Sequence, residues 1–161
     1  QKEEMIMQRE KLGSRLGFIL LSAGCAIGMH LINMGAKNIV MVDKLCSASP
    51  AGATTSLFIS PSNMFCHQGH IAEAGIIEHM AQSASAMAGY NCKVAGKPAP
   101  VGFIGEVKKF TLNFLPKIEE TMETTINVVS EAMGITLINA STSVDGEVAA
   151  TCQMKIFIRE E

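Results

Sequence analysis

Residues 71–90 read IAEAGIIEHMAQSASAMAGY, and this stretch decides the fold. Apolar side chains recur there every three or four residues, at Ile77, Met80, Ala81, Ala84, Met87 and Ala88. The spacing predicts a helix with one apolar stripe. Many of its side chains are Ala, Ser or Gly, so the helix can lie very close to whatever it packs against. Gly89 and the stretch 91–100 predict its end and a connection.

Runs typical of strands flank this helix on both sides. They occupy residues 38–45, 53–60, 103–114, 122–129, 135–140 and 147–158. Turns are expected at Pro50–Gly52 and at Asp145–Gly146, where both central residues tolerate positive φ. Apolar and polar residues alternate, which predicts an antiparallel sheet with one apolar face. One such sheet and one helix bury each other when the sheet wraps around the helix, so the predicted class is α+β.

Composition bounds the class of protein. The chain has 161 residues, of which 48% are hydrophobic and 17% charged, with a formal net charge of −2. One domain is expected, and a nucleic-acid binder is not, because neither a basic surface nor stacking aromatics are available. The five cysteines form no C-x-x-C pair. They predict reduced, mostly buried thiols in a cytoplasmic protein rather than disulfides or a zinc module.

The N-terminal region differs from the rest. Residues 1–15 are rich in charge, whereas residues 16–36 contain no Asp, Glu, Lys or Arg. About 20 such residues can cross a membrane, so residues 1–36 are expected to be an apolar extension: a membrane anchor, a buried helix or a fusion scar. Residues 9–29 resemble the first helix of sodium-coupled neurotransmitter symporters, but the chain offers at most one span and we infer no transport. The main domain is expected over residues 37–161.

A second resemblance covers most of the chain. Gly75–Gln82, reading GIIEHMAQ, is similar to the helix start of β-hydroxyacyl-acyl-carrier-protein dehydratases. The similarity continues through residues 38–45 and 103–110 and ends near Ile158. It implies a hotdog fold, in which an antiparallel sheet wraps around one long central helix. It also implies at least a dimer, and unpaired sheet edges favour dimerisation through an edge strand.

The resemblance implies a reaction and its residues. A 3-hydroxyacyl thioester on acyl carrier protein would be dehydrated to a trans-2-enoyl thioester without a cofactor. Glu78 matches the helix carboxylate, which in the family comes from the partner subunit. A backbone amide at the helix N-terminus polarises the thioester carbonyl there. The substrate-binding residues would be Gly75, Gln82, Phe65, Gly102, Phe103 and Gly105.

The family's proton-abstracting histidine has no counterpart at its usual position in this sequence. The family's histidine position falls on Met64, next to Asn63, so His67 or Asn63 would have to take its place. His70 is a weaker candidate, and His79 is expected to serve packing or an interface. A metal site at Cys66, His67, His70 and Glu73 is not favoured, because this spacing completes no usual ligand set. A non-catalytic acyl or acyl-carrier-protein binder and an acyl thioesterase remain as alternatives.

Elementary electrostatics supports the role of Glu78 independently. A carboxylate on the most apolar element would be poorly solvated, which should raise its pKa and suit it to general acid catalysis. The alternative is an exposed acid that the helix dipole stabilises near the helix start.

Overall fold

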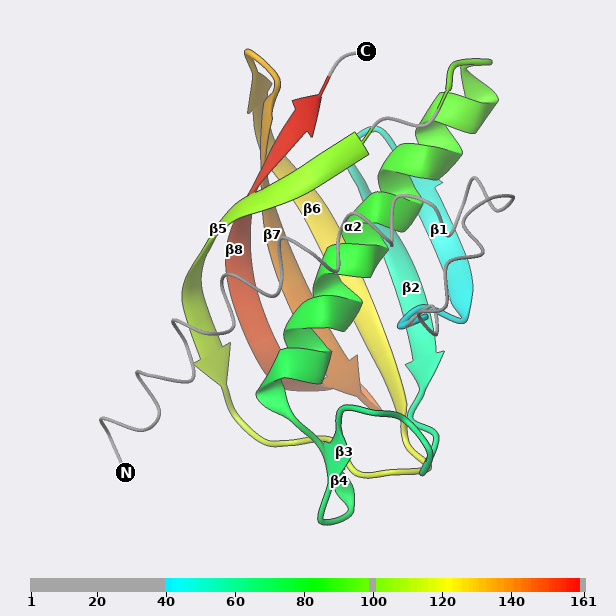
Figure 1. Ribbon diagram of the computed structural model, residues 1–161, viewed down its shortest axis with the longest axis vertical. Coiled ribbons are helices and arrows are strands. Elements are labelled where there is room, and N and C mark those ends of the chain that lie inside the picture. The colour runs from blue at the N-terminus through cyan, green and yellow to red at the C-terminus, as the bar shows by residue number, and fades with distance from the viewer. Residues whose placement is uncertain (1–39, 99–100, 160–161) are drawn as a thin grey trace.

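The structure, a computed structural model, describes residues 40–98 and 101–159 (Figure 1). A six-stranded antiparallel sheet, in the order β1-β2-β6-β7-β8-β5, curls around one long helix, α2. The strands of the sheet are β1 (Lys44–Ser49), β2 (Gly52–Phe58), β5 (Val101–Leu112), β6 (Thr121–Ala132), β7 (Ile135–Val144) and β8 (Glu147–Arg159). The helix spans Glu73–Val94, and a small hairpin of β3 (Cys66–His67) and β4 (His70–Ile71) precedes it. The α+β hotdog prediction is confirmed.

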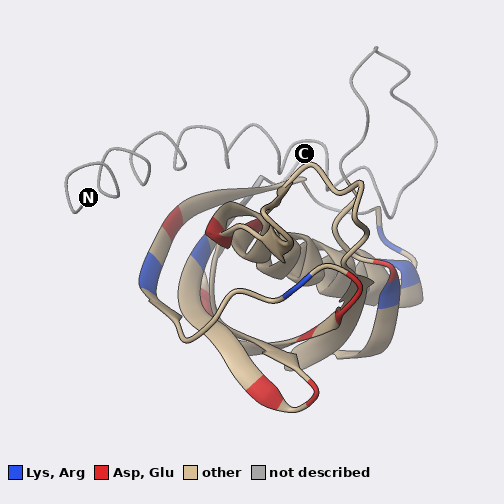
Figure 2. Cartoon of the chain, turned by 90° about the horizontal axis from the view of Figure 1, so that it is seen from below, with Lys and Arg blue, Asp and Glu red and all other residues tan. Residues whose placement is uncertain are grey.

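The alternation in the sequence sets which side of the sheet meets the helix. On β6, Met122, Thr124 and Ile126 are buried, whereas the residues between them are exposed. Direct pairing carries the pattern across neighbouring strands, because Ile126 lies opposite Ala140 and Ala140 opposite Cys152. Seen from below, the sheet wraps around the helix, with acidic and basic residues scattered over the elements (Figure 2). The predicted single apolar face is therefore the face that packs on α2.

Two predicted boundaries of the helix were wrong. The chain enters α2 at Glu73, because residues 70–71 pair with β3 instead. At the other end α2 continues past Tyr90 to Val94. A single glycine such as Gly89 costs a helix only about 1 kcal/mol, and Gly89 is buried, so packing outweighs its low propensity.

The first predicted strand was also misplaced. Strand β1 begins at Lys44, and the segment from Met41 to Asp43 lies outside it. The physical reason is that both backbone groups of Met41 bond to side chains of α2, Gln82 and His79. A residue whose N–H and C=O are occupied in this way cannot join a strand ladder. The turn at Pro50–Gly52 is confirmed, and so is the one at Asp145–Gly146, where both φ angles are positive.

The described cysteines are all free thiols. Of Cys46, Cys66, Cys92 and Cys152, the last alone is buried, so the expectation of mostly buried thiols was wrong for these four. Within residues 40–98 and 101–159, no helix has both the length and the apolarity needed to cross a membrane. The apolar segment 16–36 and the symporter-like stretch 9–29 lie outside the described residues.

Candidate active site

Glu78 lies in the second turn of α2 and is 1% exposed. Its Oε1 accepts a hydrogen bond from Gln82 Nε2 at 2.8 Å, one helical turn further on. Its Oε2 is buried and has no hydrogen-bond partner among the described residues. Burial raises the pKa of the Glu78 carboxyl above the ordinary value of 4.5, and the Gln82 bond lowers it by less. The alternative of an exposed acid is wrong, and Glu78 is suited to hold and release a proton.

Gln82 is fixed in one orientation by a second hydrogen bond. Its Oε1 accepts from the backbone N–H of Met41 at 2.8 Å. Because an N–H group can only donate, this contact defines which end of the Gln82 amide is oxygen. The NH2 end must therefore face Glu78, as the bond to Oε1 requires.

His79 follows Glu78 and is fully buried. Its Nδ1 hydrogen bonds to the backbone carbonyl of Met41, so Nδ1 carries the proton of the neutral ring. Nε2 is then a buried acceptor, and it has no partner among the described residues. Burial lowers the pKa of His79 to about 4, outweighing the Met41 carbonyl and the charge of Asp43, which raise it. The imidazole is neutral at physiological pH.

Asn63, in the loop before the helix, also contacts Met41. Its Nδ2 lies 3.3 Å from the sulfur of Met41, and its Oδ1 accepts from the Phe65 N–H at 2.9 Å. Met41 therefore connects Asn63, His79 and Gln82, and Gln82 continues to Glu78. Of the residues proposed from sequence, Asn63, Gln82 and Glu78 are joined by these contacts.

Gly75 and Phe65 meet in a tight packing contact. A Cβ added at Gly75 would lie 2.6 Å from Phe65 Cβ and 2.7 Å from Ile71 Cγ1, so only glycine fits. The Gly75 N–H already donates to the Ala72 carbonyl at 2.9 Å. Gly75 thus brings the hairpin close to the helix, and its amide is not a free donor for a thioester oxygen.

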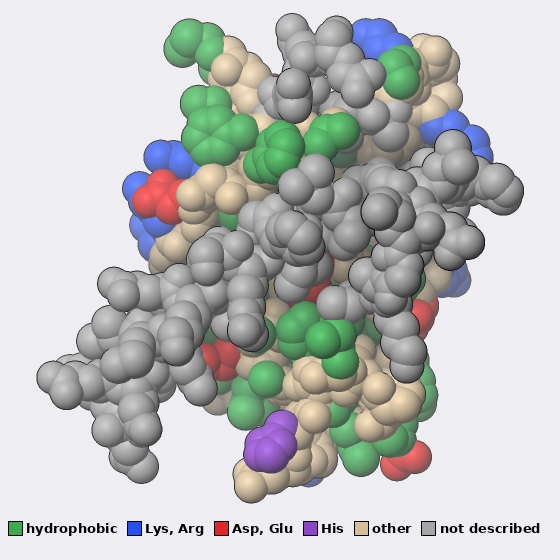
Figure 3. Space-filling view, in the orientation of Figure 1, with side chains coloured by type: hydrophobic (Ala, Val, Ile, Leu, Met, Phe, Trp, Pro, Cys, Tyr) green, Lys and Arg blue, Asp and Glu red, His purple; other side chains and the backbone are tan. Residues whose placement is uncertain are grey.

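His67 occupies a different environment. It lies at the end of β3, pairs in register with His70 on β4, and is exposed. Figure 3 shows histidine on the surface at the end of the molecule that carries this hairpin. No hydrogen bond among the described residues joins His67 to Asn63, Gln82 or Glu78. Within one chain, the candidate base and the candidate acid are thus not connected.

The three residues proposed on β5 lie on different faces of the sheet. Phe103 pairs directly with Phe157, the neighbour of Ile156, which packs on the core. Phe103 and Phe157 therefore face away from the helix. Gly105 lies under the Phe157 ring, whereas Gly102 lies against Ile156 on the helix side.

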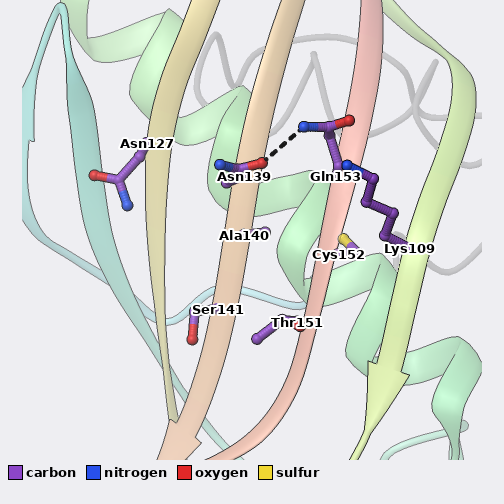
Figure 4. Close-up of a pocket in the computed structure, with 8 residues that line it drawn as sticks. All are labelled: Lys109, Asn127, Asn139, Ala140, Ser141, Thr151, Cys152 and Gln153. Carbon is purple, nitrogen blue, oxygen red and sulfur yellow. Dashed lines mark hydrogen bonds between the residues drawn. The ribbon is translucent and has the colours of Figure 1, made fainter.

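A separate concavity of about 410 Å³ lies over the middle of β6, β7 and β8 (Figure 4). Its polar lining side chains sit in cross-strand positions of the outer face, and Gln153 donates to Asn139 Oδ1 at 3.1 Å. It is an open surface of solvated polar groups with no contact to Glu78. In the described part of the chain, no cluster of three or more His, Cys, Asp or Glu side chains could hold a metal.

Sequence reasoning missed Met41 and the part played by His79. Met41 looked like one apolar residue of a strand, since no local pattern shows that side chains some forty residues later take its backbone groups. A signal for His79 was available. A histidine inside an otherwise apolar and small-residue helix must find a hydrogen-bond partner when it is buried.

Comparison with known proteins agrees with this geometry. The sheet curled around one helix defines the hotdog class. The sequence profile of the ApeP-like family, described as ApeP dehydratase, matches residues 30–161, and the chain belongs to this family. None of the curated proteins matches the sequence.

Solved structures with low identity share the fold. The dehydratase heterocomplex ApeI:P from Xenorhabdus doucetiae has a chain with 16% identity and a TM-score of 0.71, over 76% of this chain and 85% of that one. A hypothetical thioesterase from Streptococcus pneumoniae, solved with coenzyme A, has 7% identity and a TM-score of 0.56, over 73% and 86%. A virulence protein from Campylobacter jejuni has 14% identity and a TM-score of 0.60, over 84% and 97%.

Proposed function

We propose that this protein dehydrates 3-hydroxyacyl thioesters carried on acyl carrier protein to trans-2-enoyl thioesters, as in fatty acid or related polyene synthesis. One observation carries the proposal. The helix carboxyl of an ApeP-like family member, Glu78, is buried, held at one oxygen by Gln82, and free of a partner at the other among the described residues.

The reaction needs a base at C2 and an acid at the C3 hydroxyl. The base removes a proton from C2, the C3–O bond breaks, and the departing hydroxyl takes the proton of Glu78 to leave as water. Burial keeps Glu78 protonated at a higher pH than an exposed glutamate. After the step Glu78 is a carboxylate, and the Gln82 N–H stabilises that form.

The base comes from a second subunit in this proposal. His79 is unsuited, because its ring is buried and its pKa is about 4. His67 is exposed on the β3–β4 hairpin, so its side chain is free to contact a second copy of the chain. We therefore assign His67 of one copy to the Glu78 site of another. The X. doucetiae neighbour is a heterocomplex, which supports a second arrangement in which a different hotdog chain supplies the base.

The test compares Glu78→Gln with a matched control, Glu123→Gln, on the exposed face of β6. Wild-type protein is given a 3-hydroxyacyl thioester on acyl carrier protein, and formation of the enoyl product and of free thiol is followed. Glu78→Gln should lose about 10²–10⁴-fold in turnover while remaining folded, because a general acid is removed. Glu123→Gln should match the wild type.

Other outcomes identify the alternatives. Release of free thiol without enoyl product would show an acyl thioesterase, the activity named for the S. pneumoniae neighbour. Tight binding of acylated carrier protein without any product, unaffected by Glu78→Gln, would show a non-catalytic binder. Turnover by His67→Ala at the wild-type rate, in the presence of a second hotdog chain, would place the base on that chain.

A further inference from the structure

Met41 and three buried polar residues of α2 form a hydrogen-bonded set, which we call the Met41 clamp. It consists of Met41, His79, Gln82 and Glu78. His79 Nδ1 donates a hydrogen bond to the Met41 carbonyl, and the Met41 N–H donates one to Gln82 Oε1. The four residues are at most 4% exposed, so water cannot replace a lost partner.

The clamp determines what Gln82 presents to Glu78. An amide side chain can turn end over end, and it would then offer its oxygen to the carboxyl instead of its NH2. The Met41 N–H prevents this, provided that Met41 stays in place. His79 holds the other backbone group of Met41, so it keeps the Met41 N–H over Gln82.

The helix backbone beneath His79 is held as well. Ser83 Oγ donates to the His79 carbonyl at 2.6 Å. Ser83 Oγ also lies 2.6 Å from Thr55 Oγ1 on β2, and since its own proton goes to His79, Thr55 is the donor of that second bond. Both hydroxyls are fully buried. These bonds fix the position from which the imidazole reaches Met41.

We propose that His79 is a positioning residue, which fixes the Gln82 amide against Glu78 by clamping Met41. This inference rests on the proposed function of Glu78 and adds a residue that the chemistry itself does not touch. Within the described chain, the charged group that acts on His79 is Asp43, and no charged group is among the causes that act on Glu78.

The experiment compares His79→Ala with His79→Asn. Asparagine can place its side-chain N–H near the position of Nδ1, so it should keep the bond to the Met41 carbonyl, whereas alanine cannot. In His79→Ala the Met41 amide should exchange with solvent faster, and kcat should fall on the order of 10²-fold because the acid is no longer held in position. The alkaline limb of the pH–rate profile should move to higher pH, because Glu78 loses the hydrogen bond that stabilises its charged form. His79→Asn should restore all three.

The two possible failures are distinguishable. Unchanged Met41 exchange and an unchanged alkaline limb in a folded His79→Ala variant would overturn the clamp while leaving the role of Glu78 intact. A loss of kcat in His79→Ala that His79→Asn does not restore, with no shift of the limb, would show a merely structural role and also overturn it. Wild-type turnover in Glu78→Gln would reject the proposed function, and the Met41 exchange would still decide whether the clamp exists.

Discussion

The start of α2 and the β3–β4 hairpin are close in sequence but chemically opposite. In α2, Glu78, His79, Gln82 and Ser83 are buried polar residues with defined hydrogen bonds. In the hairpin, His67 is exposed. Burial raises the pKa of a carboxyl and suits it to donate a proton, but another group must remove the substrate proton. An exposed histidine can do this only where it contacts a second protein surface. The difference favours a site that is completed by a second subunit.

The largest effect should come from mixing two inactive variants. Glu78→Gln and His67→Ala should each lose at least about 10²-fold in turnover. If the acid and the base come from different copies, random reassortment should restore about a quarter of wild-type turnover, because about half of the pairs are mixed and each keeps one intact site. Enoyl formation after joint refolding measures this. Mixing that restores nothing, although both variants form pairs, would contradict a site shared between copies.

The buried His79 should make the stability of the fold sensitive to acid. His79 titrates at about 4 in the folded protein against 6.5 ordinarily, so the unfolded chain takes up the proton first as pH falls. The stability gained by burying a neutral His79 is fully present above pH 6.5. It is lost as pH falls toward 4, which lowers the free energy of unfolding by about 3 kcal/mol in total. Denaturant melts of wild type and His79→Asn between these pH values should show this difference. Parallel losses in both proteins would contradict it.

Packing should be tight where α2 meets the hairpin and looser at an edge strand of the sheet. Gly75→Ala would place Cβ against Phe65 Cβ, which the backbone holds, and should cost about 1–3 kcal/mol in unfolding free energy. Gly105→Ala on β5 meets the tip of the half-exposed Phe157 ring, which can rotate away, and should cost less than about 1 kcal/mol. Equal losses in denaturant melts would show that the approach of hairpin to helix is not tight.

The sequence predicted most of the fold because alternation and helical period are local signals. Residues such as Met122 and Ile126 on β6, or Met80 and Ala84 on α2, show their buried face directly. Glu78 and Gln82 were found from the resemblance of the stretch 75–82 to a dehydratase helix, and their spacing of one helical turn places them on one face. The position of Met41 could not be predicted, since its backbone bonds to side chains of a distant element. The exposure of His67 could not be predicted either, because strands β3 and β4 have two residues each, too few to show a pattern in the sequence.

Burial is held to raise the pKa of the Glu78 carboxyl, and direct titration tests this. Carbon-13 NMR of the side-chain carboxyls, with Glu78→Gln to identify the signal, gives the midpoint for this one group. The Glu78 midpoint should lie above the ordinary value of 4.5. A midpoint at or below 4.5 would contradict it.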